Sequence, residues 1–236
     1  MKIVKLNDWH VPFHDPDAIN AALRFCKEVQ PDEIVLDELH DFYSLSRFNK
    51  EPSRIASLQE ELDEVGIYLK QLRRENPNAN IRLLDSNHLA RLRKYIWANA
   101  QAFYGLRSLE ITNLLELADY NITFQDSWEV RGRFLFKHGD IVRKHSAYTC
   151  RGEIEREGMS GMSGHTHRLG QHYVSQRGGE YVWSEAGCLC DLSPEYISGR
   201  PNWQHGIGLV EFYGNTRTFY SQVIPIINNE VVLYGQ

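Results

Sequence analysis

The chain has 236 residues, of which 42% are hydrophobic and 24% are charged. A chain of this length can bury one good core but not two large ones, so we expect a single domain over residues 1–236. The formal net charge of -5 argues against a large basic surface that follows the phosphates of a long duplex.

The first half of the chain alternates predicted strands and helices. Met1 leads into an alternating strand over residues 2–6, without the apolar stretch of a signal peptide. No apolar run approaches the roughly 20 residues of a membrane helix, so we expect a cytoplasmic protein without membrane contact. A helix is predicted from Asp15, which can cap it, to Pro31, and a short strand follows at residues 33–36.

Helical periodicity then predicts a long amphipathic helix over residues 53–74, followed by a strand over residues 80–84. Residues 89–117 are more helical and interrupt the alternation, so we expect a helical insertion there that could form a wall beside the substrate. From Ile122 onward strand signals dominate, at residues 122–124, 133–136, 181–183, 207–212 and 218–224. The pattern is α/β in the first half and mostly β in the second.

Residues of the types that can bind metal ions, Asp, Glu, Asn and His, form five short clusters, most of them directly after a predicted strand. The clusters are Asp8-Trp9-His10, Asp37-Glu38, Asn87-His88, His138-Gly139-Asp140 and Gly164-His165-Thr166-His167. Loops at the carboxyl ends of strands converge on one crevice in α/β sheets. Imidazole nitrogen with carboxylate and amide oxygen suits divalent transition ions, and the set is too large for one ion. Two ions that share a carboxylate could hold a hydroxide and clamp an in-line displacement at phosphorus.

The four cysteines, Cys26, Cys150, Cys188 and Cys190, lack the paired spacing of a structural zinc site. We expect reduced thiols that are mostly packed in the interior. Cys188 and Cys190 alternate as strand neighbours do, so they should face the same side.

In this order, the five clusters resemble the calcineurin-like metallophosphoesterases. Further stretches at residues 41–47, 139–143 and 187–190 are similar to small uncapped members from bacteria and their phages. The resemblance implies an α/β fold, a four-layer α/β/β/α sandwich of two mixed β-sheets flanked by helices. It also implies a hydrolase with two divalent ions, for which manganese is favoured and iron, zinc, nickel and cobalt are alternatives.

The resemblance assigns roles to the clusters. One ion would take Asp8, His10 and His167, and the other would take Asn87, His138 and His165. Counting back from Asp41 in the family pattern places Glu38 at the position that bridges the two ions. A tight bridge between two ions favours the shorter side chain of Asp37. We therefore favour Asp37 as the bridge and keep Glu38 as the alternative. His88 would face the leaving-group oxygen as a general acid. Arg168, which follows the last cluster, is a candidate for binding the substrate phosphate.

Two departures from the family pattern bear on activity. Ser86 replaces a glycine near the metals, which removes easy access to positive φ. Leu89 replaces an acidic residue that could orient the metal-binding histidines. Either change could lower metal affinity or turnover.

The leading functional hypothesis is a phosphomonoesterase or phosphodiesterase acting on small or nucleotide-like phosphate esters. The first alternative is a DNA or RNA nuclease of the repair type. A nuclease that acts on duplexes would need either a basic surface that bears aromatic side chains or a capping domain. The second alternative is a metal-binding protein with little turnover.

Overall fold

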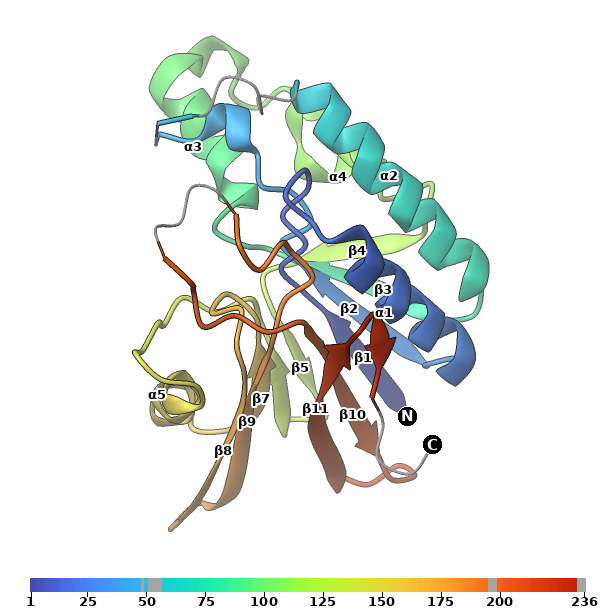
Figure 1. The fold of residues 1–236 in the computed structure, drawn as a ribbon, viewed down its shortest axis with the longest axis vertical. Helices are drawn as coiled ribbons and strands as arrows, with labels where there is room; N and C mark the ends of the chain where they lie inside the picture. The colour runs from blue at the N-terminus through green and yellow to red at the C-terminus, as the bar shows by residue number, and fades with distance from the viewer. Residues whose placement is uncertain (48, 51–56, 195–198, 233–236) are drawn as a thin grey trace.

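The computed structural model describes residues 1–47, 49–50, 57–194 and 199–232. They form two mixed β-sheets that pack against each other, with helices on the two outer faces (Figure 1). The predicted four-layer α/β/β/α class is therefore confirmed.

The larger sheet has seven strands in the order β12-β11-β10-β1-β2-β3-β4. Its parallel part consists of β1 (Lys2–Leu6), β2 (Glu33–Asp37), β3 (Asn80–Leu84) and β4 (Ile122–Gln125). Its antiparallel part consists of β10 (Gly206–Phe212), β11 (Phe219–Ile227) and β12 (Glu230–Val231). Leu6 pairs with Leu36 and Leu36 with Leu83, so the loops after β1, β2 and β3 leave the sheet at the same edge.

The smaller sheet has five strands in the order β5-β6-β7-β9-β8. These strands are β5 (Trp128–Val130), β6 (Phe134–Phe136), β7 (Ser160–Ser163), β8 (Leu169–Gln176) and β9 (Gly179–Ala186). The three central strands, β6, β7 and β9, run parallel, and β5 and β8 are antiparallel edges. The loops after β6 and β7 consequently also leave their sheet at one edge.

The outer helices are fixed by capping residues and by apolar faces. In α1 (Pro16–Val29), the Asp15 carboxylate caps the helix by accepting from the backbone of Asp17 and Ala18. In α2 (Leu58–Glu75), Ser57 and Glu60 form a capping box. The predicted start of this second helix, at residue 53, lies outside the described residues. Both helices cover the seven-stranded sheet, and α5 (Tyr148–Glu157) covers β8 and β9 of the other (Figure 1).

Three hydrophobic layers separate the four layers of secondary structure. In β1 and β2, side chains such as Val4 and Leu36 pack towards α1 and α2, while Ile3 and Val35 pack against the second sheet. The layer between the sheets is completed by Phe134 and other residues of the smaller sheet. Burial on both faces explains why β2 reads as a continuous apolar run.

Residues 89–117 contain α3 (Leu89–Asn99), η3 (Gln101–Phe103), η4 (Arg107–Leu109) and α4 (Ile111–Leu114), all between β3 and β4. The short η1 (Tyr43–Leu45) follows β2. The sequence did not predict α5, because only Cys150 and Ile154 of its side chains are apolar and buried, and Gly152 lies between them. Within the described ranges, no helix has the length and apolar character needed to cross a bilayer.

Candidate metal centre

The predicted ligands meet where both sheets end. The loop after β1 carries Asp8 and His10, and Asp37 and Glu38 lie at the end of β2. The segment between β3 and α3 carries Asn87 and His88, and the smaller sheet contributes His138 after β6 and both His165 and His167 after β7. The loops of two sheets thus bring together side chains that are far apart in the sequence.

A first group of ligand atoms belongs to Asp8, His10, Glu38 and His167, all buried and within 4.8 Å of one another. Nε2 of His10 lies 3.0 Å from Nε2 of His167. Two nitrogens bound at right angles to one ion, each about 2.1 Å from it, would be about 3 Å apart. The spacing therefore fits two ligands of the same ion.

A second group consists of Glu38, His138 and His165, again within 4.8 Å of one another. Nε2 of His138 lies 3.2 Å from Nδ1 of His165, 2.7 Å from Oδ1 of Asn87 and 2.9 Å from Oε2 of Glu38. The same Oε2 atom is 3.6 Å from Nε2 of His10. Glu38 is therefore the residue that the two groups share.

Asp37, which we favoured as the bridge, occupies a different place. Its carboxylate forms a fully buried ion pair with Lys5, and its Oδ1 lies 3.5 Å from Nδ1 of His138. Alternation along the strands explains this direction, since Asp37 shares the face of Val35 and Lys5 shares the face of Ile3, both towards the second sheet. Glu38 follows the strand with a φ of 45° and turns to the sheet edge. The geometry favours Glu38 for the bridging position.

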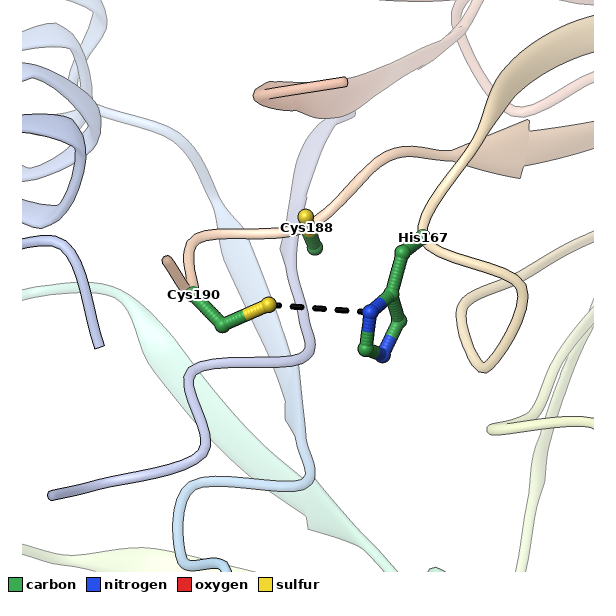
Figure 2. A group of neighbouring side chains, drawn as sticks. All are labelled: His167, Cys188 and Cys190. Carbon is green, nitrogen blue, oxygen red and sulfur yellow. Dashed lines mark hydrogen bonds between the residues drawn. The ribbon is translucent and has the colours of Figure 1, made fainter. Parts of the chain in front are cut away.

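Three of the histidines have a supporting group at their other ring nitrogen. Nδ1 of His10 lies 3.3 Å from Oδ2 of Asp41, and Nδ1 of His138 faces Asp37. The side chain of Cys190 points towards the ring of His167 (Figure 2), and its Sγ lies 3.6 Å from Nδ1 of that ring. Such partners fix the orientation and tautomer of metal-binding imidazoles.

Asp41 supplies a carboxylate beside His88, where Leu89 replaces the acidic residue of the family pattern. Oδ2 of Asp41 lies 3.2 Å from Nδ1 of His88, while Leu89 is buried in the core. The carboxylate that the sequence lacks after His88 is thus supplied by the loop after β2. Ser86 is not among the described residues with positive φ, so the missing glycine costs no backbone strain.

The backbone is strained at five of the predicted ligands. A positive φ, between 45° and 69°, occurs at Asp8, His10, Glu38, His165 and His167. Only a glycine fits at position 164 without a shift of its neighbours, because a Cβ atom there would lie 2.3 Å from Oδ2 of Asp8. The backbone N–H of His165 donates to the same carboxylate at 3.0 Å. Clustered strain of this kind is typical of functional sites.

The carboxylates of the site favour protonation of two of its imidazoles, those of His10 and His138, whereas burial lowers the pKa of His88 and His165. Burial lowers the pKa of His10, but Glu38 and Asp41 outweigh it and raise the pKa to about 10. Burial likewise opposes protonation of His138, yet Glu38 and Asp37 raise its pKa well above the usual value. A site that draws cations so strongly fits divalent ions, which would replace those protons on binding.

A cavity of about 600 Å³ opens above the two groups. Its lining includes the predicted residues His10, Glu38, Asn87, His88, His165 and His167. It also includes Asp41, Tyr43, Arg91 and Trp203, which were not predicted as site residues. Arg91 follows His88 by one helical turn, a spacing that could have indicated it. Trp203 packs on His167 at 4.2 Å between ring centroids but had no local signal in the sequence.

Arg168, the predicted phosphate ligand, does not line this cavity. Its guanidinium donates to the backbone carbonyl of Arg143. Among the described arginines, Arg91 lines the cavity, where it donates to Oδ1 of Asp41 at 2.6 Å and contacts Nε2 of His88 at 2.8 Å.

The loop that carries Tyr43 is held by Glu61 of α2, whose carboxylate accepts from the backbone of Phe42 and Tyr43 at 2.8 and 3.1 Å. Burial, and then the charge of Asp41, raise the pKa of Glu61 to about 8. The folded state therefore binds more protons than the unfolded state between about pH 4.5 and pH 8, so stability should fall as pH rises through that range. Glu61→Gln should flatten this dependence, as measured by urea unfolding at several pH values. Parallel pH profiles for the two proteins would contradict the assignment.

No family model matches the chain. Its relatives include the Gene 54 protein of Mycobacterium phage D29, 28% identical over 249 residues that cover 99% of this chain and 97% of that protein. The Gene 54 protein of Mycobacterium phage L5 is 26% identical over 251 residues, which cover 100% and 97% of the two chains.

Similar solved structures include Vps29 proteins, each 10% identical to this chain. Wild-type Vps29 from Entamoeba histolytica complexed with Zn+2 has a TM-score of 0.48, covering 98% of this chain and 96% of that one. A single mutant of the same protein has a TM-score of 0.49 with the same coverage. Vps29 from Chaetomium thermophilum has a TM-score of 0.49, covering 98% and 95%.

Proposed function

We propose that this chain is a metal-dependent phosphoesterase, a hydrolase that cleaves phosphomonoesters or phosphodiesters at a dinuclear metal centre. The observation that carries the proposal is the pair of ligand groups that share Glu38 beside a cavity. The same side chains carry the resemblance to calcineurin-like metallophosphoesterases.

The residues of the two groups divide between two ions. Asp8, His10 and His167 would hold one ion, Asn87, His138 and His165 the other, and Glu38 would reach both. When bound, such ions polarise the phosphoryl oxygens and activate water as the nucleophile. The mixture of imidazole, carboxylate and amide suits manganese, with iron, zinc, nickel and cobalt as alternatives.

The residues at the cavity wall would act on the substrate itself. His88 lines the cavity, with Nδ1 near Asp41 and Nε2 in contact with Arg91. Burial lowers the pKa of His88, and the charges of Glu38 and Asp41 oppose this shift. As an imidazolium, His88 would donate its Nε2 proton to the leaving-group oxygen. The guanidinium of Arg91 would then be released from Nε2 to attract the substrate phosphate.

Hydrolysis of 4-nitrophenyl phosphate and bis(4-nitrophenyl) phosphate by protein stripped of metal, with and without added manganese, tests the proposal. We expect turnover only with metal and an occupancy near two ions per chain. Two bound ions without turnover of either ester, a cyclic nucleotide or single-stranded DNA would overturn the proposal in favour of a metal-binding protein.

Cys190 should tune the affinity for the ion at His167. Because its sulfur lies at Nδ1, it can accept the proton of that nitrogen and leave the Nε2 lone pair free for an ion. Cys190→Ala should weaken manganese binding by roughly 10- to 100-fold, the usual cost of losing an outer partner. Cys188→Ala is the matched control, since Cys188 is also buried but its Sγ contacts the carbonyl of Gln204 at 3.6 Å. Equal losses in both variants, measured by calorimetric titration, would contradict this role.

A further inference from the structure

A second cavity continues from the metal centre along α3. It measures about 570 Å³ and shares Ser46, Asn87 and Arg91 with the first cavity. We call it the cationic groove, because its lining includes Arg47, Lys50, Arg91 and Lys94. Among the described residues that line it, none is an aspartate or glutamate.

The cationic groove is built into one face of α3. Arg91, Lys94, Tyr95 and Ala98 follow at spacings of three, four and seven residues, so they lie on the same side of the helix. At 1.5 Å per residue, the path from His88 to Ala98 is about 15 Å long. The groove therefore leads away from the metal centre far enough for more than one phosphate.

The charges on this helix face are available to a ligand. Arg91 is held by Asp41, but Lys94 is exposed and makes no ion pair within the described part of the chain. Tyr95 also lies in the groove, with 42% of its surface exposed. Exposed aromatic rings beside cations are the features with which proteins bind single-stranded nucleic acid, by base stacking and phosphate attraction.

The opposite side of Asn87 has the reverse character. A hollow of about 320 Å³ there is lined by Asp85, Asp126 and Asp140. Its lysine, Lys137, is held by Glu153 and Glu157 at 2.7 and 2.6 Å, and two of its aspartates are paired, Asp85 with Arg93 at 3.1 Å and Asp140 with Arg156 at 2.5 Å. The cationic groove, with exposed Lys94 and no carboxylate among its described lining residues, is therefore the better path for a polyanion that reaches the metal centre.

We propose that the cationic groove binds the phosphates of a single-stranded oligonucleotide next to the phosphate that lies at the metal centre. The proposal rests on the proposed function and narrows its substrate class to nucleic-acid strands. The net charge of -5 does not oppose it, because the groove needs only a local excess of cations.

The test is the salt dependence of binding of a fluorescein-labelled oligothymidylate of about ten nucleotides, followed by anisotropy. For single strands, each phosphate contact contributes about 0.7 to the slope of log affinity against log salt. Lys94→Ala should make the slope shallower by about 0.7, and Lys50→Ala with Lys94→Ala by about 1.4. Lys70→Ala is the matched control, since Lys70 is an exposed lysine on α2 that lines neither cavity.

Equal slopes for the wild type, Lys94→Ala and Lys70→Ala would overturn the inference. So would displacement of the strand by a nucleoside triphosphate at the same molar concentration, because this would indicate a pocket for a single nucleotide. Tighter binding of a duplex of equal length would also overturn it. Since anisotropy requires no turnover, the binding result stands by itself, whereas the proposed function is rejected only if the nitrophenyl esters, a cyclic nucleotide and single-stranded DNA all fail to react.

Discussion

Glu38→Gln is expected to remove manganese binding and turnover almost completely. Glu38 is the residue common to both ligand groups, with Oε2 at 2.9 Å from His138 and 3.6 Å from His10. An amide keeps the shape of the carboxylate but loses the negative charge that two cations would share. The loss of affinity should exceed the roughly 10- to 100-fold typical of an outer partner. Calorimetric titration and elemental analysis measure it directly.

Asp37→Asn is the comparison that decides between the two neighbouring carboxylates. It should retain both ions with weaker binding, because Asp37 faces Nδ1 of His138 and not the shared position. It should also destabilise the protein, since it leaves the buried Lys5 ammonium without its partner, at a cost of about 3–5 kcal/mol. Lys5→Met in the same chain should restore much of this stability. If Glu38→Gln retained both ions and Asp37→Asn lost them, Asp37 would be the bridging residue.

His88→Ala should leave both ions bound but lower turnover by roughly a hundred- to ten-thousandfold, the range typical of a general acid. The loss should depend on the leaving group. A nitrophenolate departs readily without a proton, whereas an alkyl or nucleoside alkoxide does not, so the alkyl ester should suffer far more. Steady-state rates on matched aryl and alkyl esters, with metal content measured in parallel, test this expectation.

Arg91→Gln separates proton transfer from phosphate attraction, because Arg91 touches Nε2 of His88 without being able to supply a proton at neutral pH. It should slow aryl and alkyl esters by similar factors. If His88→Ala also slowed both esters equally, His88 would act through charge stabilisation, and if it lost metal, its role would be structural.

The order of elements in the first half followed from the sequence because the signals there are local. Alternation marked β1, helical spacing and Asp15 marked α1, and the apolar run at residues 33–36 marked β2. The missed helix α5 lacks such a signal, because few of its side chains are apolar and buried. A local signal can also mislead: the segment around His165 and His167 alternates as a strand would, but it is a loop with positive φ at both histidines.

The sequence by itself determined which residue types gather at the centre. Asp8, His10, Asn87 and His138 all lie just beyond or near a strand end, and the carboxyl ends of parallel strands must meet at one edge. The residue types of the candidate ligands and their order along the chain could therefore be predicted from the sequence.

Only the tertiary structure decided how the neighbours of these ligands are used. Asp37 and Glu38 are both candidates in the sequence, and the burial of Asp37 against Lys5 between the sheets favours Glu38. The same holds for the contacts of Cys190 with His167 and of Arg91 with Asp41, which join side chains from separate loops and layers. Such contacts are set by the packing of one sheet on the other, and no periodicity along the chain encodes the relative position of two sheets.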